Sequence, residues 1–235
     1  MKKKQIVLLI VEGPSDDEAL SYSLMQLYEQ YFQDIRVEIL HGDITSQRES
    51  TPSNIVTKVG AIVKSFLNQY SLKKNDISKI IQITDTDGAF IPDDRVLLDK
   101  SCKTPRYTTE TIRTWNPANI IARNKKKAGI LRTLRRTSNI NTIPYHVVFM
   151  SCNLDHVLYD KLNCSDEEKE KNAFHFQEKY EQDLNGFWSY IARSSFSVQS
   201  DFVESWKFIE KDLNSLNRYT NIHTVLPEPI PTKIK

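Results

Sequence analysis

The stretch IVLLIVEGPSDDEAL, residues 6–20, decides the fold, because it passes abruptly from a continuous apolar run to a group of four acids. An apolar run of about seven residues rich in β-branched side chains predicts a strand covered on both faces. Ser15, with Glu18 three positions later, forms a capping-box pattern that predicts the start of a helix. A buried strand followed at once by a helix is typical of α/β proteins.

The same alternation recurs along the first part of the chain. Further strands are predicted at 35–40, 78–84 and 145–150, and amphipathic helices at 15–32 and 53–70. Short connections between such elements predict βαβ units with right-handed crossovers. We therefore expect an α/β, Rossmann-like fold with a mainly parallel central sheet of about four strands flanked by helices.

The remainder of the chain differs in composition. Residues 91–142 are polar and basic and are predicted to be an insertion into a domain that spans residues 1–155. Within this insertion, residues 117–136 predict a helix that Gly129 interrupts or weakens. Residues 156–235 are predicted to form a helical C-terminal extension, in which Ser165 is followed three residues later by a glutamate in another capping-box pattern.

Composition limits the class of protein. The 235 residues are 39% hydrophobic and 26% charged, and the net charge is +2, as expected of a globular protein. No apolar run approaches the roughly 18 residues that a membrane span needs. The N-terminal apolar run meets Glu12 directly and has no cleavage site of a signal peptide. The three cysteines form no C-x-x-C pair, which argues against a disulfide framework or a structural zinc. We expect a cytoplasmic protein.

Carboxylates follow three of the predicted strands. Glu12 follows the first strand, Asp43 the second, and Asp85 and Asp87 the third. The carboxyl ends of the strands of an open parallel sheet meet at one edge, where ligands bind. Carboxylates that converge there repel one another unless a cation is present, and Mg²⁺ prefers oxygen ligands. The sequence therefore predicts a magnesium site at this edge.

Each acidic motif also has a structural interpretation. Asp16 and Asp17 are placed to stabilise a helix N-terminus electrostatically. The DTDG sequence at 85–88 is composed of ordinary turn residues. It is not a complete EF-hand loop, because the later ligands are absent.

Two motifs, IVEGPSDDEAL at 10–20 and IIQITDTDG at 80–88, resemble the Toprim domain. That fold is shared by type IA and type II topoisomerases, DnaG-type primases, small ribonuclease maturases and the overcoming-lysogenisation-defect (OLD) nucleases. Its motifs are a Glu-Gly pair after the first strand and an Asp-x-Asp after the third, matched here by Glu12 with its glycine and by Asp85 and Asp87. The motif's extension past the Glu-Gly pair is closest to the OLD-like branch.

The resemblance implies a role for each acid. Glu12 would act as general base or metal ligand, and Asp85 and Asp87 would hold Mg²⁺ or Mn²⁺, with two ions expected. Asp16 would be an additional ligand. Asp155 stands where OLD-like nucleases place an acid at the start of the helix after the fourth strand, although the family residue is Glu. The implied activity is hydrolysis of phosphodiester bonds in DNA or RNA.

The chain also departs from the family. Full-length OLD proteins carry an ATPase on the same chain, whereas no G-x-x-x-x-G-K-[ST] motif occurs here. The resemblance therefore implies a free-standing Toprim protein that works with a separate ATPase, as in phage defence.

Two other functions stay open. One is a haloacid-dehalogenase-like phosphatase with Asp85 as nucleophile, although that motif follows the first strand and has Thr where Ala89 stands. The other is a non-catalytic nucleic-acid-binding subunit with a degenerate Toprim site, because Asp155 replaces Glu.

The net positive charge of the chain is concentrated in the predicted insertion. Between Lys100 and Arg136 there are eleven Lys or Arg and one acid, Glu110. Such a patch favours an anionic partner, although a solvated helix face is the commoner explanation of a basic run. The residues expected to hold a nucleic-acid backbone are Arg123, Lys125, Lys126, Lys127, Arg132, Arg135 and Arg136. Tyr107 and Trp115 are candidates for stacking on bases.

Overall fold

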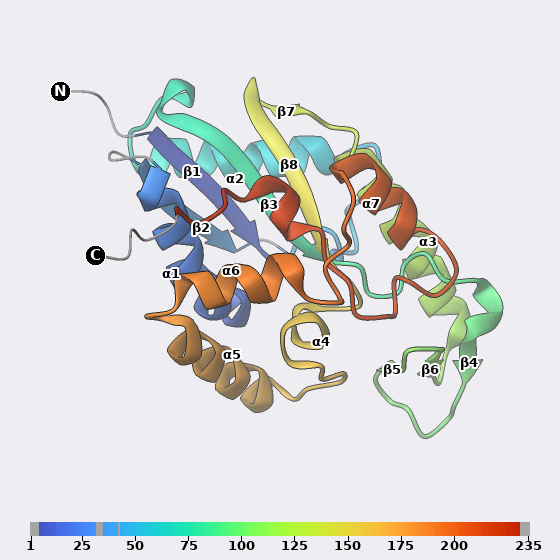
Figure 1. Ribbon diagram of the computed structural model, residues 1–235. Helices are drawn as coiled ribbons and strands as arrows, with labels where there is room; N and C mark the ends of the chain where they lie inside the picture. The colour runs from blue at the N-terminus through green and yellow to red at the C-terminus, as the bar shows by residue number, and fades with distance from the viewer. Residues whose placement is uncertain (1–4, 32–34, 42, 231–235) are drawn as a thin grey trace.

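A computed structural model describes residues 5–31, 35–41 and 43–230, and its centre is a five-stranded sheet (Figure 1). The strands are β1 (Gln5–Val11), β2 (Ile35–His41), β3 (Ile77–Asp85), β7 (Asn139–Ile140) and β8 (Ile143–Met150). They lie in the order β2-β1-β3-β8-β7, and every pairing is parallel except that of β7 with β8. The predicted α/β class and mainly parallel sheet are confirmed, with β7 as a fifth, short strand.

Strand β1 is buried on both faces, as its apolar run predicts. Alternate side chains of a strand point to opposite faces. Val7, Leu9 and Val11 enter one core, and Ile6, Leu8 and Ile10 enter the other. The sheet therefore separates two hydrophobic cores, each of which needs its own layer of helices.

Helices cover both faces of the sheet (Figure 1). One core includes side chains of α1 (Pro14–Tyr31), α4 (Leu154–Tyr159), α5 (Asp166–Tyr180) and α6 (Leu184–Arg193). The other includes side chains of α2 (Ile55–Gln69), α3 (Pro117–Leu134) and α7 (Phe202–Ile209). Single turns of 3₁₀-helix lie at η1 (Lys74–Asp76), η2 (Asp93–Arg95) and η3 (Ile222–Val225). Residues beyond 155 thus contribute to both cores.

Two predicted helix features are wrong. Helix α1 begins at Pro14, so Ser15 lies inside its first turn and is not a cap; proline is well suited to the first helical position. Helix α3 continues without a break through Gly129. A Cβ at that position would lie 2.8 Å from Cγ of Pro52, so the glycine permits close packing of α3 on a neighbouring segment. The capping box of Ser165 with Glu168 is present at α5.

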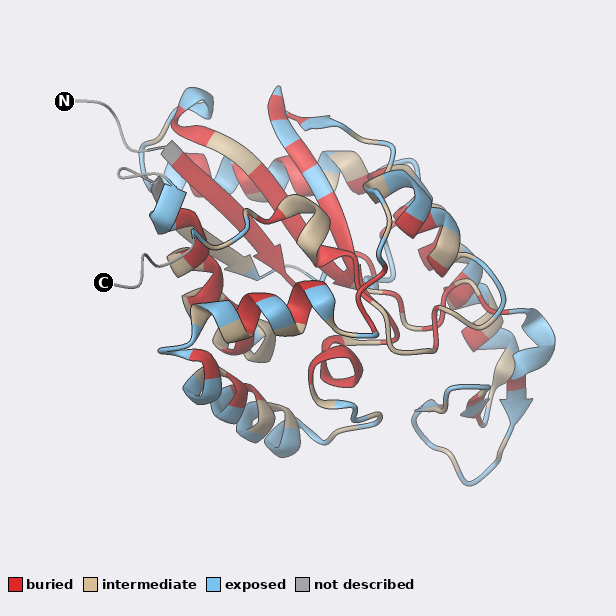
Figure 2. Cartoon of the chain, viewed as in Figure 1, coloured by how far each residue is buried: buried red, intermediate tan, exposed pale blue. Residues whose placement is uncertain are grey.

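The basic insertion contains a second, small sheet. Its strands are β4 (Val96–Leu98), β5 (Arg106–Tyr107) and β6 (Ile112–Thr114), in the order β4-β6-β5. In Figure 1 this sheet lies at the edge of the molecule next to α3. Much of it is exposed (Figure 2), and its buried side packs in a third, small core that includes Val96, Ile112 and Leu216.

The C-terminal segment covers the end of β8 on the edge where β7 pairs with its beginning. Phe149 N donates to Asn221 Oδ1 at 2.9 Å, and Thr220 Oγ1 donates to Phe149 O at 2.8 Å. Ser151 N donates to Tyr219 O at 2.8 Å. The backbone groups of β8 are thereby satisfied by chain that follows it by some seventy residues. In the part of the chain that the structure describes, no helix has the length and apolarity of a membrane span.

The folded chain gives a matched pair of tryptophan substitutions. Trp206 is 1% exposed, its ring lies 5.0 Å from that of Phe149, and its indole N–H donates to Val147 O. Trp206→Ala should lower the free energy of unfolding by about 3–5 kcal/mol through the cavity it leaves. Trp115 is 61% exposed, and Trp115→Ala should change it by less than about 0.5 kcal/mol. Urea denaturation of both variants measures the difference, and equal losses would contradict this account of the core.

Candidate functional site

The side chain of Glu12 links the C-terminal ends of β1 and β3 by hydrogen bonds. Glu12 immediately follows β1, and its Oε1 accepts hydrogen bonds from Asp85 N at 3.0 Å and from Thr84 Oγ1 at 2.7 Å. Thr45 Oγ1, after β2, donates to the same oxygen at 3.4 Å. The acid is thus held by three segments, as expected where parallel strands end together.

Asp87 lies in a tight turn that only a glycine can follow. Asp87 has φ +49° and Gly88 has φ +67°, so two successive residues are left-handed. A Cβ on Gly88 would lie 2.7 Å from Cδ2 of Leu216, which leaves no room for a side chain. Thr86 N and Asp87 N donate to the carbonyls of Met150 and Cys152. The turn is therefore fixed on the end of β8.

Asp16 has a structural function as well as a place in the site. Its Oδ2 accepts hydrogen bonds from Glu12 N at 3.1 Å and Gly13 N at 3.0 Å, which holds the turn between β1 and α1. Its other oxygen takes part in neither bond. Burial raises the pKa of Asp16 to about 6 despite these two bonds. Asp17 differs, because it pairs with His41 Nε2 at 3.0 Å on the exposed side.

A buried lysine lies among the carboxylates. Lys127, on α3, has a side chain 1% exposed; its ammonium pairs with Asp87 Oδ2, lies 4.0 Å from Glu12 Oε1 and donates to Ser46 Oγ at 3.1 Å. Burial opposes the charge of Lys127, but Asp87, Glu12 and Asp85 outweigh it and raise its pKa. Burial likewise opposes the charge of Asp87, but Lys127 and then Arg123 lower its pKa. The pair is therefore ionised.

The pKa values of the other two central acids, Glu12 and Asp85, are raised, whereas that of Asp87 is lowered. Burial, opposed by Lys127 and reinforced by Asp87, raises the pKa of Glu12 to about 7. Burial and the neighbouring carboxylates raise the pKa of Asp85 well above its usual range. One lysine does not neutralise all the acids at this edge. A bound cation would reduce the remaining repulsion between their carboxylates.

The acids predicted for the site line one hollow of about 670 Å³. Its walls include Glu12, Asp16, Asp85, Asp87 and Asp155, together with Asp43 after β2. Asp155 is the second residue of α4, and the N–H of the residue before it, Leu154, donates to Asp85 Oδ1 at 3.0 Å. Burial raises the pKa of Asp155. The four acids that follow the first three strands, Glu12, Asp43, Asp85 and Asp87, thus lie around one hollow at the carboxyl edge of the sheet, and Asp16 and Asp155 line it as well.

The donor set suits a hard divalent cation, although it is not closed into a cage. It offers carboxylate oxygens, which Mg²⁺ and Mn²⁺ prefer. Among the described residues, no three Asp, Glu, His or Cys side chains are already arranged to hold a metal ion. The ammonium of Lys127 lies beside Asp87 and close to Glu12.

The basic residues predicted to bind nucleic acid do not form one free surface. Lys127 is buried among the acids and cannot reach a nucleic-acid backbone. Arg123 is engaged by Tyr107 Oη at 2.6 Å and by Asp87 O at 3.0 Å. Other pairings are those of Arg132 and Arg135 with Glu210, of Lys125 with Asp93, and of Lys126 with the carbonyls of Gln47 and Arg48. Arg136 is exposed.

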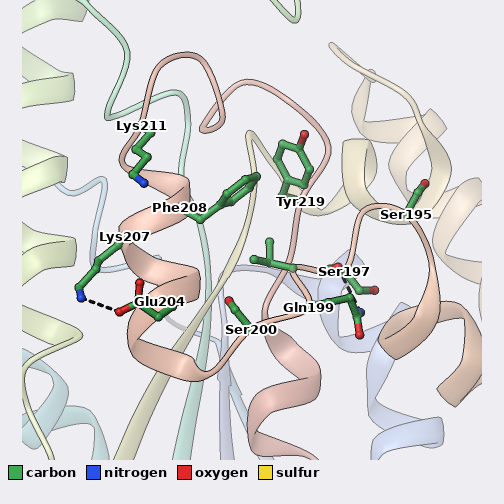
Figure 3. Close-up of a pocket in the computed structure, with 10 residues that line it drawn as sticks. Ser195, Ser197, Gln199, Ser200, Glu204, Lys207, Phe208, Lys211 and Tyr219 are labelled. Atoms are coloured by element: carbon green, nitrogen blue, oxygen red, sulfur yellow. Dashed lines mark hydrogen bonds and ion pairs between the residues drawn. The ribbon is translucent and has the colours of Figure 1, made fainter.

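A second hollow, of about 450 Å³, lies beside α7 (Figure 3). It is lined by hydroxyl and amide side chains, two lysines and a single acid, Glu204, which is paired with Lys207. Ser197 and Gln199 use their side chains to donate to backbone carbonyls. These groups support the loop before α7 and offer no set of acids comparable to that of the first hollow.

The raised pKa values of the acids predict a pH dependence of stability. Glu12 has an ordinary value of 4.5 and a folded-state pKa of about 7, so between these values the folded protein holds a proton that the unfolded chain has lost. The free energy of unfolding should therefore fall as pH rises from about 4.5 to 7. Glu12→Gln should flatten this fall and be about 1–3 kcal/mol more stable than the parent at pH 8 in EDTA. Urea denaturation between pH 4 and 8 measures it, with the exposed Glu178→Gln as a control that should follow the parent.

The buried ion pair predicts a second effect on stability. Lys127→Met leaves Asp87 buried without its partner and should lower the free energy of unfolding by about 3–5 kcal/mol. Lys125→Met is the matched control, because that lysine is 66% exposed. It should change the free energy of unfolding by less than about 1 kcal/mol. Adding Asp87→Asn to Lys127→Met should restore part of the loss. A double variant no more stable than Lys127→Met alone would contradict the pairing.

Comparison of the chain with protein-family models, with curated proteins and with solved structures finds no match.

Proposed function

We propose that this chain is a metal-dependent nuclease of the Toprim type, closest to the OLD-like branch, which hydrolyses phosphodiester bonds in DNA or RNA. The observation that carries the proposal is the convergence of Glu12, Asp16, Asp85, Asp87 and Asp155 on one hollow. They come from chain segments far apart in sequence, in the order and at the strand ends of the Toprim motifs. Acids so close together are costly unless they serve to bind a cation.

The proposed cofactor is Mg²⁺ or Mn²⁺, with two ions expected. When bound, such ions activate water, orient the scissile phosphate and neutralise the leaving oxygen. Asp85, Asp16 and Asp155 are the carboxylates that we assign to holding them, together with the oxygens of Glu12 and Asp87 that Lys127 does not occupy.

The chain's own groups have complementary tasks in this proposal. Glu12 would serve either as a metal ligand or as the general base; its pKa near 7 in the metal-free site suits the second task, because a general base works best near the pH of the reaction. Lys127 keeps Asp87 ionised, so that this carboxylate remains available as a ligand. Arg123 donates to the carbonyl of Asp87 and supports the same turn.

The proposal extends to partners. The substrate is a nucleic acid, and the absence of a P-loop motif from these 235 residues leads us to propose a separate ATPase subunit, as the OLD-like resemblance implies.

Cleavage assays test the proposal directly. Purified protein is incubated with plasmid DNA and with total RNA in Mg²⁺, Mn²⁺ or EDTA. We expect cleavage in at least one metal and none in EDTA. Asp85→Asn should lower the cleavage rate about 100-fold or more, because the negative charge that develops on the phosphate is then less well stabilised. Asp93→Asn is the matched control, since Asp93 is an exposed acid outside the hollow and that variant should cleave like the parent.

Three results would contradict the proposal. Cleavage that persists in EDTA or in Asp85→Asn would show that the acids do not carry the activity. Release of phosphate from small phosphomonoesters without cleavage of nucleic acid would favour the haloacid-dehalogenase-like alternative. Salt-sensitive binding of nucleic acid without cleavage in either metal would favour the non-catalytic alternative.

A further inference from the structure

The outer face of the small sheet brings two arginines together. The strand register places Leu97 opposite Arg113 and Arg113 opposite Arg106, so the three form one row across β4, β6 and β5. All three are exposed, whereas Val96 and Ile112, one residue earlier on β4 and β6, are buried. Like charges directly opposite each other on a sheet destabilise it. This pairing therefore favours an anionic partner over the row.

An exposed tryptophan lies directly after β6. Trp115 follows Arg113 by two residues and Thr114, the last residue of the strand, by one. It is 61% exposed, whereas the other tryptophans, Trp188 and Trp206, are 6% and 1% exposed. A large aromatic ring left in solvent beside arginines offers a stacking surface.

The cations of this face are free of ion pairs, in contrast to those of α3. Within the described part of the chain, no ion pair involves Arg106, Arg113, Lys100 or Lys103. Asp99, which follows β4, attracts Arg113 electrostatically without forming an ion pair with it, and its carboxylate accepts hydrogen bonds from the N–H and hydroxyl of Ser101. The positive charge here is therefore available to a ligand.

The small sheet also borders the carboxylate hollow. Thr104 and Pro105, in the loop between β4 and β5, and Tyr107, in β5, line the hollow that contains Asp85 and Asp87. The side chain of Tyr107 lies below the exposed row and accepts from Arg123, whose other nitrogen reaches the carbonyl of Asp87. Strand β5 therefore carries Arg106 of the exposed row and, at the next residue, Tyr107 of the wall of the hollow.

We propose that the outer face of the small sheet binds single-stranded nucleic acid and leads it to the carboxylate hollow. Arg106 and Arg113, with Lys100 and Lys103, contact successive phosphates, and Trp115 stacks on a base. This assignment rests on the proposed nuclease function for its purpose, and it moves the binding surface from α3 to the strands before it.

The chemistry of the face selects the occupant. Phosphate contacts by arginine give affinity without sequence information. Stacking on an aromatic side chain requires a base that is unstacked, which a single strand provides and an intact duplex does not. An acidic protein could satisfy the arginines, but it has no bases to stack on Trp115, so the exposed ring favours a nucleic acid.

Binding measured in EDTA tests this inference separately from cleavage. A fluorescein-labelled single-stranded oligonucleotide and its duplex are titrated with the full chain, and anisotropy gives Kd. We expect Trp115→Ala to weaken binding of the single strand about 5- to 100-fold. Arg106→Gln with Arg113→Gln should weaken it and lower the slope of log K against log salt by about 1.4. Intrinsic fluorescence adds a direct readout, because binding should quench Trp115 and leave the two buried tryptophans unchanged.

Matched controls lie on other parts of the surface. Lys64→Gln with Lys74→Gln removes two exposed lysines from α2 and η1, and Tyr70→Ala removes a ring that is 49% exposed. Both controls should bind like the parent. Arg106→Gln with Arg113→Gln should have a urea midpoint equal to the parent's or slightly higher, because it removes a like-charge pair, and this separates lost contacts from lost folding.

The possible results discriminate between this inference and the nuclease proposal. Equal binding by the parent and by the sheet variants, duplex bound as tightly as single strand without quenching of Trp115, or no binding of nucleic acid would each overturn the inference. Binding that depends on the sheet, without cleavage in any metal, would support it and overturn the nuclease instead. Metal-dependent cleavage that is unchanged in the sheet variants would support the nuclease proposal and overturn this inference.

Discussion

The pairing of Lys127 with Asp87 is the interaction on which the arrangement of this site depends. Acids at the ends of β1 and β3 can be buried together only if a positive charge accompanies them or some of them keep their protons, and Lys127 keeps Asp87 ionised. That charge comes from α3, which must therefore approach the carboxyl edge of the sheet closely. The contact of Gly129 with Pro52 permits this approach. The insertion is thus required for the sheet edge to hold its acids, in addition to any binding function of its own.

Much of the fold could be predicted, because the strongest local signals agree with the tertiary structure. The apolar runs at β1 and β3 become central strands, and Ser165 with Glu168 caps α5 as its spacing indicates. The same capping pattern at Ser15 fails because the preceding proline already occupies the first helical position. The two-residue strand β7 has no periodicity to detect, since its pairing is decided by the strand that follows it.

The convergence of the acids can be predicted from the strand pattern, whereas the pairing of Lys127 with Asp87 cannot. Glu12 and Asp85 follow strands, and parallel strands deliver their ends to one edge. The basic run around residue 125 indicates a solvated surface when only composition is considered. Its spacing contains the contrary signal, because Ile120, Lys127 and Leu131 fall on one helical stripe, and all three are buried. A charged residue on an apolar stripe requires a buried partner, and only the tertiary structure identifies it as Asp87.

The support of the Asp87 turn by the C-terminal segment has a consequence for the order of folding during synthesis. The carbonyl of Ser215 accepts from Thr86 Oγ1 and from Cys152 N, and its hydroxyl oxygen accepts from Phe90 N. A ribosome delivers the acids of β1 and β3 long before residue 215. Until then the turn lacks these partners, and contacts between residues so far apart form late because closing the intervening loop is slow. The nascent chain therefore carries the Asp87 turn without its C-terminal support until the last part of the chain has been made.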